Sequence, residues 1–193
     1  MRKRTPELRD HVLAVAVELL ANAGVSGFTA RQVAAAASTS TPAVYELFGD
    51  KAGLLREVYF AGFRLLGDAL EQLEDSAEPR ADLVRLVGLY RGFIRENPVL
   101  AEVMFSRPFS DFDPGPAELR ATSSVRVFIV GRVRRAVEAG ELVGDATDIA
   151  HVLVALLQGL AAAENAGRLG TSRASIERRW RLGVDAVLAG MSA

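Results

Sequence analysis

Apolar side chains recur with the period of an α-helix along nearly the whole chain. In residues 6–23, for example, Leu8, Val12, Val15 and Leu19 fall at i, i+4, i+7 and i+11 and therefore share one stripe of a helix. Residues 125–130 are β-branched enough to form a strand, but no neighbouring segment offers them a strand partner. The pattern therefore predicts an all-α fold of about nine helices.

Glycine, proline and capping residues predict where these helices begin and end. Thr29 and Gln32 have capping-box spacing at the start of a short helix expected over residues 28–37. The polar run 38–40 then turns the chain, and Pro42 suits the first turn of the next helix, over residues 41–48. Further helices are expected over residues 50–73, 81–96, a short segment ending at 105, 117–139, 146–167 and 171–190, with a proline-rich loop at 107–116.

Residues 28–48 thus have the layout of a helix-turn-helix: two short helices joined by a short turn and braced by a longer first helix. Such a unit places its second helix in the major groove of DNA. When the two short helices pack against the longer first helix, we expect four residues of the second short helix to face outward: Thr41, Pro42, Ala43 and Tyr45. The expected core of the unit is Val33, Ala36, Ala37, Val44 and Phe48, packed against Val12 and Leu19.

The same region resembles the DNA-binding signature of the TetR family of bacterial transcriptional regulators. Seven points match in register within residues 28–55: Thr29, Val33-Ala34, Ser40, Tyr45, Phe48, Lys51 and Leu54. The resemblance implies a helix-turn-helix DNA-binding domain over residues 1–52 and a helical ligand-binding and dimerisation domain over residues 53–193. Ser38 departs from the pattern, because the family usually has glycine there and a non-glycine residue at positive φ costs on the order of 1 kcal/mol.

The resemblance also assigns base contacts to individual residues. Ala30 and Arg31 match positions at which the family's second helix touches DNA, and Arg31 can grip a guanine or a phosphate. Thr41, Pro42 and Ala43 hold the base-reading positions. Of these, Pro42 and Ala43 offer only apolar contact, for instance to a thymine methyl group.

Contacts to phosphate are implied for a second group of residues. Tyr45 and Lys51 match the family's phosphate-holding positions, and Lys51 stands at the start of a helix whose backbone N–H groups favour an anion. The resemblance and the basic N-terminal arm complete the expected DNA-binding set with Lys3, Arg4, Thr29 and Ser40.

The C-terminal body has the features of a dimerisation domain. Residues 149–163 are apolar all round, so we expect one side of that helix to pack in its own chain and the other against a second copy. Segments 90–105 and 154–160 resemble one TetR-type C-terminal domain, although Val154 and Gln158 stand where that subgroup usually has tryptophan and histidine. The expected four-helix interface of the homodimer includes Leu156, Gly159, Leu160, Trp180, Val184 and Val187.

Aromatic and methionine side chains gather in the central helices. At helical spacing such residues are ordinarily core, and the alternative is a mainly apolar cavity with a few polar anchors. The family resemblance favours a pocket for a small, mostly apolar effector. Its candidate residues are Phe63, Tyr90, Phe93, Met104, Phe105, Phe128 and Gln158.

Charge and composition exclude several other classes of protein. A net charge of −1 excludes a polycation that coats nucleic acid indiscriminately, so DNA binding must come from a local patch. The chain has no cysteine for disulfides or thiolate sites. Glu7, Arg9 and Asp10 interrupt the apolar region that a signal peptide needs. The longest uncharged run, residues 149–163, is shorter than the ~20 residues of a membrane span, so we expect a cytoplasmic protein.

Catalytic and metal-binding patterns are not found in the sequence. His11 and His151 are the only histidines, and Asp111 and Asp113 lack calcium-loop spacing. Because no nucleophile, base and orienting residue form a set, we expect no enzyme and no cofactor. We expect instead a repressor that binds a palindromic double-stranded operator as a dimer and is released by an effector. The alternative is a DNA-binding structural protein of the same fold without a small-molecule effector.

Overall fold

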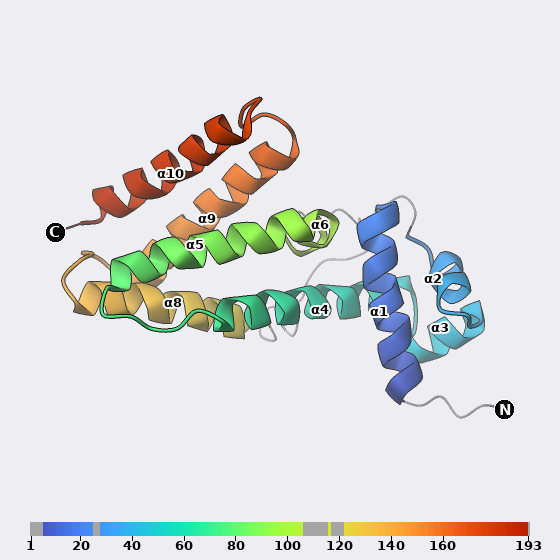
Figure 1. Ribbon diagram of the computed structural model, residues 1–193. Helices are drawn as coiled ribbons and strands as arrows, with labels where there is room; N and C mark the ends of the chain where they lie inside the picture. Colours follow the sequence, from blue (N-terminus) through green and yellow to red (C-terminus); the bar gives the residue numbers. More distant parts are fainter. Residues whose placement is uncertain (1–5, 25–27, 106–115, 117–121, 193) are drawn as a thin grey trace. The chain divides into compact units, whose positions relative to one another are not determined.

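The computed structural model describes residues 6–24, 28–105, 116 and 122–192. Within these residues the chain forms nine helices and no strand, so the expected all-α fold is confirmed (Figure 1). The expected loop at 107–116, apart from Pro116, and the first turn of the helix expected at 117–139 lie outside the described residues. The helices are α1 (Pro6–Ala23), α2 (Ala30–Ala36), α3 (Thr41–Phe48), α4 (Lys51–Glu71), α5 (Pro79–Glu96), α6 (Pro98–Phe105), α8 (Ser123–Glu138), α9 (Ala146–Asn165) and α10 (Arg173–Gly190).

The chain divides into two compact units. The first comprises Met1–Leu65 and Asn97–Thr122, and the second comprises Leu66–Glu96 and Ser123–Ala193. The first unit therefore contains α1, α2, α3, most of α4 and α6. The second contains the end of α4 together with α5, α8, α9 and α10.

In the first unit, α1 packs against α2 and α6 while α2 packs against α3. The buried stripe of α1 is Val12, Leu13, Ala16 and Leu20, whereas Leu8, Val15 and Leu19 of the expected stripe are half-buried at its edge. Both stripes fit a helical period, and only the positions of the neighbouring helices decide between them. An ion pair of 2.8 Å between Arg9 and Glu57 joins α1 to α4.

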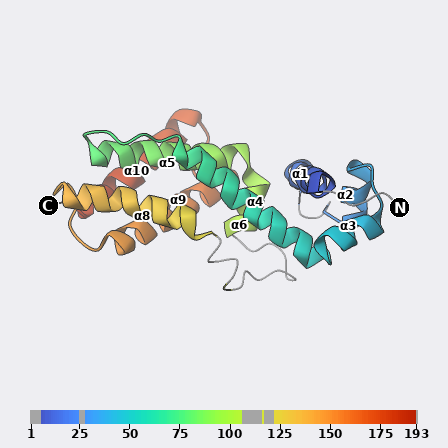
Figure 2. The same ribbon diagram turned by 90° about the horizontal axis from the view of Figure 1, so that it is seen from below.

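In the second unit, α5 lies beside α8 and α9, and α9 also packs against α10 (Figures 1 and 2). Apolar residues that recur at helical spacing form the core between these helices. They are Leu83, Leu86 and Tyr90 on α5, Val133 on α8, Leu153 and Leu157 on α9, and Trp180, Val184 and Leu188 on α10.

Two arginines of α8 form hydrogen bonds to the connection between α4 and α5. Arg132 donates to the carbonyl oxygen of Leu73 at 2.5 Å, and Arg135 donates to the carbonyl oxygen of Ser76 at 2.8 Å. Arg135 also pairs with the buried carboxylate of Asp82 at 2.9 Å. Of the three arginines at 132, 134 and 135, only Arg134 is exposed.

Among the described residues, α9 is the one helix long and apolar enough to cross a membrane by length and composition, with a mean hydropathy of 1.5. It exceeds the uncharged run found in the sequence because Asp148 and Glu164 lie within its ends. Its buried face packs on α5, α8 and α10. A core helix of a soluble bundle has the same composition, so this single helix does not indicate a membrane protein.

Candidate nucleic-acid interface

Hydroxyl groups fix the start of both short helices. The Thr29 hydroxyl accepts from the backbone N–H of Gln32 at 3.2 Å and donates to the Gln32 side-chain oxygen at 2.6 Å. The expected capping box is therefore half formed, because the Gln32 side chain meets the hydroxyl rather than the Thr29 backbone. Ser40 caps α3 in the same manner, accepting from the N–H of Ala43 at 3.2 Å.

The turn between α2 and α3 depends on a strained residue. Ser38 has φ of 51°, the one positive φ at a non-glycine position among the described residues. This conformation lets the N–H of Thr39 reach the carbonyl oxygen of Ala34 at 2.9 Å, which closes the end of α2. The structure thus has a non-glycine residue at positive φ in this turn, the conformation to which the expected cost applies.

Two residues expected at the DNA surface have buried side chains. Ala30 is 5% exposed and Ala43 is 6% exposed, so the expectation that Ala43 faces outward is wrong. Ala36, expected in the core, is exposed, and Ala34 takes its place. The error arises because neighbouring residues of a helix point about 100° apart, and the packing of the first unit buries Ala34 and Ala43 and leaves Ala36 exposed.

The outward ridge of α3 (Thr41, Pro42, Tyr45 and Glu46) follows from the same periodicity. Pro42, Tyr45 and Glu46 are exposed at i, i+3 and i+4, and Thr41 is half-exposed beside them. Tyr45 is 44% exposed although it is aromatic, which is unusual for a residue with only a packing role. The sequence reasoning missed Glu46, although its i+4 spacing from Pro42 places it on the same face. On α2, Arg31 and Gln32 are exposed as well.

The corner between α3 and α4 is tight and carries a negative charge. Gly53 leaves no room for a side chain, because a Cβ there would lie 1.9 Å from the carbonyl oxygen of Phe48. The Asp50 carboxylate accepts from the N–H of Gly53 at 2.7 Å and caps α4. The N-terminus of α4 beside the half-buried Lys51 is therefore already capped by a carboxylate, and a phosphate there would share it with Asp50. Lys3 and Arg4 lie outside the described residues.

The seven residues expected to line an effector pocket are divided between the two units. Phe63, Met104 and Phe105 belong to the first, where the rings of Phe63 and Phe105 meet edge to face at 6.0 Å. Tyr90, Phe93, Phe128 and Gln158 belong to the second. There the Gln158 amide donates to the Tyr90 hydroxyl at 3.4 Å, and burial raises the pKa of Tyr90 to about 12. The pocket itself stays a prediction.

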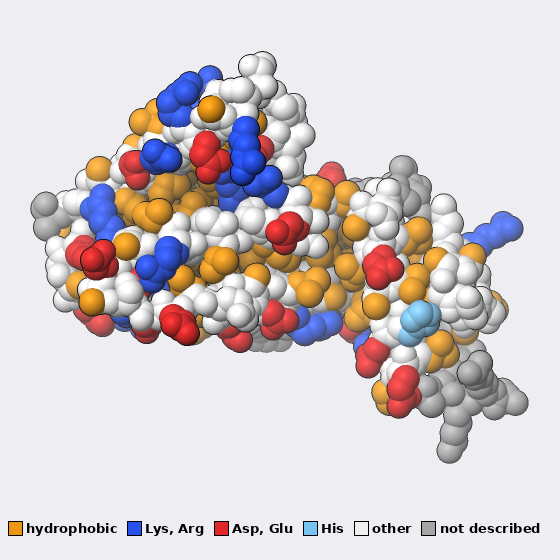
Figure 3. Space-filling model, viewed as in Figure 1, with side chains coloured by type: hydrophobic (Ala, Val, Ile, Leu, Met, Phe, Trp, Pro, Cys, Tyr) orange, Lys and Arg blue, Asp and Glu red, His pale blue; other side chains and the backbone are white. Residues whose placement is uncertain are grey.

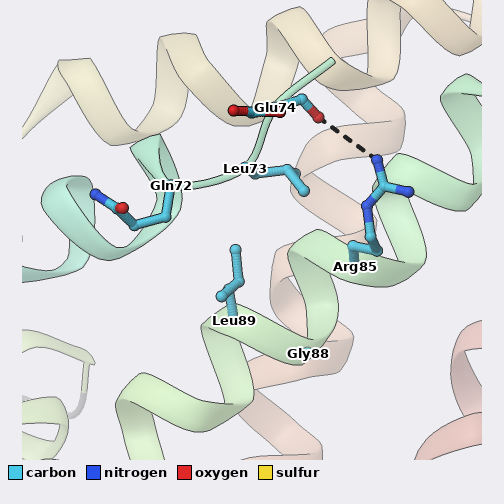
Figure 4. Close-up of a pocket in the computed structure, with 6 residues that line it drawn as sticks. All are labelled: Gln72, Leu73, Glu74, Arg85, Gly88 and Leu89. Carbon is cyan, nitrogen blue, oxygen red and sulfur yellow. Dashed lines mark hydrogen bonds between the residues drawn. The ribbon is translucent and has the colours of Figure 1, made fainter. Parts of the chain in front are cut away.

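An open depression of about 520 Å³ lies in the second unit, between the end of α4 and the outer side of α5 (Figure 4). None of its lining residues was expected from the sequence: Gln72, Leu73, Glu74, Arg85, Gly88 and Leu89. Arg85 reaches across to the carbonyl oxygen of Glu74 at 3.5 Å, and it also pairs with Asp82. The guanidinium group of Arg85 is therefore already paired within the protein. No group of three or more acidic or histidine side chains gathers at metal-binding distance in the described parts of the chain.

The helices expected to form the dimer interface expose a different set of residues from the one expected. Trp180 and Val184 are 3% and 4% exposed, so they pack inside their own protomer. The Trp180 indole donates to Glu164 at 2.6 Å and lies under the Arg91 guanidinium at 4.8 Å, which holds α10 to α9 and α5. Gly159 is exposed, and Leu156, Leu160 and Val187 are half-buried.

Further apolar residues on these helices are open to solvent. Leu182 is 67% exposed and Val152 is 46% exposed, and the small residues Ala155 and Ala186 are exposed near them in sequence. A Cβ on Gly183 would lie 3.3 Å from the Leu160 side chain, so α9 and α10 approach closely at this point. Figure 3 shows the arginine side chains gathered over α10, where Arg178, Arg179 and Arg181 are exposed.

Known protein families match both parts of the chain. The family of bacterial regulatory proteins called tetR matches residues 12–58, and the tetracyclin repressor-like C-terminal domain matches residues 83–187. No curated protein sequence matches the chain.

Solved structures resemble the chain over its whole length. A protein of unknown function from Rhodococcus sp. RHA1 has 27% sequence identity and a TM-score of 0.81, with 100% of both chains covered. The TetR-family transcriptional regulator PfmR from Thermus thermophilus has 21% identity and a TM-score of 0.70, with 94% of this chain and 99% of that chain covered. A structure described as the molecular basis for control of antibiotic production by bacterial hormones has 23% identity and a TM-score of 0.73, with 98% and 100% covered.

Proposed function

The chain belongs to the TetR family of bacterial transcriptional regulators, and from this premise we propose that it is a repressor that binds a near-palindromic operator as a homodimer. Proteins of this family regulate transcription and are not enzymes. A small, mostly apolar effector releases the repressor from its operator. The protein acts in the cytoplasm, where bacterial DNA lies.

The geometry of α2 and α3 is the observation that supports DNA binding most directly. Two capped helices and a four-residue turn hold the ridge of α3 clear of the core. In this proposal Arg31 and Thr41 contact base edges, and Pro42 offers its ring to a thymine methyl group. Ala30 and Ala43 contribute by packing, because their small buried side chains let the helices approach closely.

Contacts to phosphate hold the ridge in register. Tyr45 and Lys51 bind the backbone of the duplex, and Thr29 and Ser40 lie at the helix starts that face it. The arm that carries Lys3 and Arg4 reaches a neighbouring groove. These contacts carry no base information, so they set affinity and orientation while Arg31 and Thr41 set preference.

Homodimer formation is supported by the open apolar faces of α9 and α10. Leu182 and Val152 are too exposed to contribute to the protomer core, and on α9 the small exposed residues Ala155 and Gly159 follow Val152 at i+3 and i+7, on the same face. Helices with small residues approach closely, and a twofold pair of two such helices makes a four-helix interface. The interface consists of this surface together with Leu156, Leu160 and Val187.

Release by an effector requires two states of the dimer. In the DNA-bound state the two recognition helices lie about 34–36 Å apart and enter successive major grooves. An effector bound among the aromatic residues of the central helices favours a spacing that no longer fits. It shifts the equilibrium only by the difference between its affinities for the two states. The bacterial hormone named for one structural relative is consistent with a small-molecule effector here.

Fluorescence anisotropy with duplexes selected from a random library tests DNA binding. We expect an affinity that falls steeply with salt, since each phosphate contact releases counterions. No salt-sensitive affinity for any duplex would contradict the proposal. A screen of small apolar molecules for release of the selected duplex tests the effector. Failure of every compound to change operator affinity or melting temperature would favour a DNA-binding structural protein.

A further inference from the structure

Glu46 extends the ridge of α3 toward the end of the helix. It is exposed, it follows Tyr45 directly, and it lies one helical turn beyond Pro42. Residues at i and i+4 share a face of a helix, so a groove that admits Pro42 also receives Glu46. Pro42 has no polar side-chain atom, so the hydrogen-bonding chemistry of this ridge lies in Thr41, Tyr45 and Glu46.

An ionised carboxylate accepts hydrogen bonds and cannot donate them. In the major groove, guanine presents two acceptors and thymine presents one acceptor and a methyl group. Adenine presents an amino donor beside an acceptor, whereas cytosine presents its N4 amino group alone. Cytosine is therefore the base that offers a carboxylate a hydrogen-bond donor in the major groove without placing an acceptor beside it.

The surrounding phosphates make this discrimination stronger. A carboxylate entering the groove meets repulsion from the backbone of the duplex, and opposite a guanine it would also face acceptors. Opposite cytosine the repulsion is offset by a charge-assisted hydrogen bond, which is roughly twice as strong as a neutral one. The carboxylate thus acts largely by penalising the wrong bases.

We propose that Glu46 is a specificity-determining residue that selects a cytosine at one position of each operator half-site. The proposal rests on the proposed function, in which α3 enters the major groove.

Selection from a random duplex library with the full-length protein tests this assignment. Wild type, Glu46→Gln and Glu46→Ala are compared, with Glu138→Ala as the matched control because Glu138 is an exposed carboxylate on α8. In Glu46→Ala we expect the preference for cytosine at one half-site position to fall about 5- to 150-fold, the range for a well-formed contact to a base. In Glu46→Gln we expect the same position to shift toward adenine, which pairs with an amide through both N6 and N7.

Two results separate this proposal from the function on which it rests. If Glu46→Ala binds duplex DNA with salt-sensitive affinity but keeps the wild-type base preference at every position, the assignment to Glu46 is wrong. The proposed function as a DNA-binding regulator is then not contradicted. An equal loss at every position in Glu46→Ala, or the same loss in Glu138→Ala, also overturns the assignment to Glu46. If wild type itself shows no salt-sensitive affinity for any duplex, the proposed function fails.

Discussion

At Asp82, hydrogen bonds outweigh the cost of burying a carboxylate. The side chain is 1% exposed, and this desolvation alone raises its pKa. Its oxygens accept from the hydroxyl of Ser76 at 2.5 Å, from the N–H of Ser76 at 2.9 Å and from Arg135 at 2.9 Å. Together with the charge of Arg85, these bonds lower the pKa of Asp82 below its usual value. The ionised form is therefore the one that the fold stabilises.

Because the pKa of Asp82 is lower in the folded protein than in the unfolded chain, the free energy of unfolding should depend on pH under acidic conditions. The unfolded carboxyl titrates near pH ~3.9, so ionised Asp82 stabilises the fold above about pH 4, and the contribution is lost as the pH falls through the lower folded pKa. We expect Asp82→Asn to lower the free energy of unfolding by about 1–3 kcal/mol at pH 7 and by less below pH 4. Urea unfolding across this range measures the difference. Asp68→Asn, on the exposed side of α4, is the control.

Tyr45 and Lys51 differ from Thr41 in the kind of DNA contact that we assign to them. Replacing Lys51 with Ala should weaken binding to all sequences and reduce the slope of log affinity against log salt by about one, because one phosphate contact is lost. Tyr45→Phe should weaken binding uniformly with little change in slope, since only a neutral hydroxyl is removed. Anisotropy at several salt concentrations measures both. Thr41→Ala is the comparison, and uniform weakening there would remove Thr41 from the base-reading set.

At the scale of elements, the turn after α2 and the corner before α4 set the position of α3. The turn requires a left-handed residue at Ser38, and the corner requires a glycine at Gly53. Gly49, between them, also has positive φ, at 82°. The position of the recognition helix thus depends on a few backbone conformations as well as on its apolar face.

Replacing Ser38 with glycine should stabilise the protein. Glycine adopts positive φ without the steric cost that serine bears, so we expect the free energy of unfolding to rise by about 1 kcal/mol. Thr39→Gly is the matched control, because Thr39 has no positive φ to relieve, and it should destabilise the protein through the greater freedom of the unfolded chain. Denaturant unfolding at constant slope compares them, and a loss of stability in Ser38→Gly would contradict the strain.

At the scale of the whole molecule, the proposed operator binding depends on the proposed homodimer. Two recognition helices can occupy successive major grooves only if two protomers associate. The buried side of α10 is fixed by Trp180 and by its hydrogen bond to Glu164, so the helix presents its other side without support from a partner. In the proposed homodimer, a face already positioned within its own protomer needs less ordering on association.

Val152→Glu should separate the proposed dimer. Val152 is exposed on α9, and the charged residue one turn before it, Asp148, has the same sign as the new carboxylate. A charge placed in the apolar interface therefore loses its hydration without gaining a partner, and we expect the dissociation constant of the dimer to rise about ten- to a hundredfold. Light scattering at micromolar concentration measures the mass, and operator affinity should fall with it. Val84→Glu, at another exposed valine on α5, is the control and should leave the mass unchanged. A monomeric wild type would contradict the interface.

The sequence predicted the helical class, the order of the elements and the helix-turn-helix, because these depend on local features. Apolar periodicity, the capping residues Thr29 and Ser40, and Pro42 act within one or two helical turns of themselves. The strain at Ser38 was indicated by the family resemblance and not by these local features. They could not predict the side to which Ala43 turns, because a helix of eight residues offers two overlapping apolar faces.

Only the tertiary structure decided which face each helix buries. It turned Ala30, Ala43, Trp180 and Val184 inward and left Glu46 and Leu182 outward, and it drew Arg132 and Arg135 to the connection between α4 and α5. The physical reason is that burial is shared between segments far apart in the chain. A residue is covered only when another helix lies against it, and the position of that helix depends on the packing of all the others.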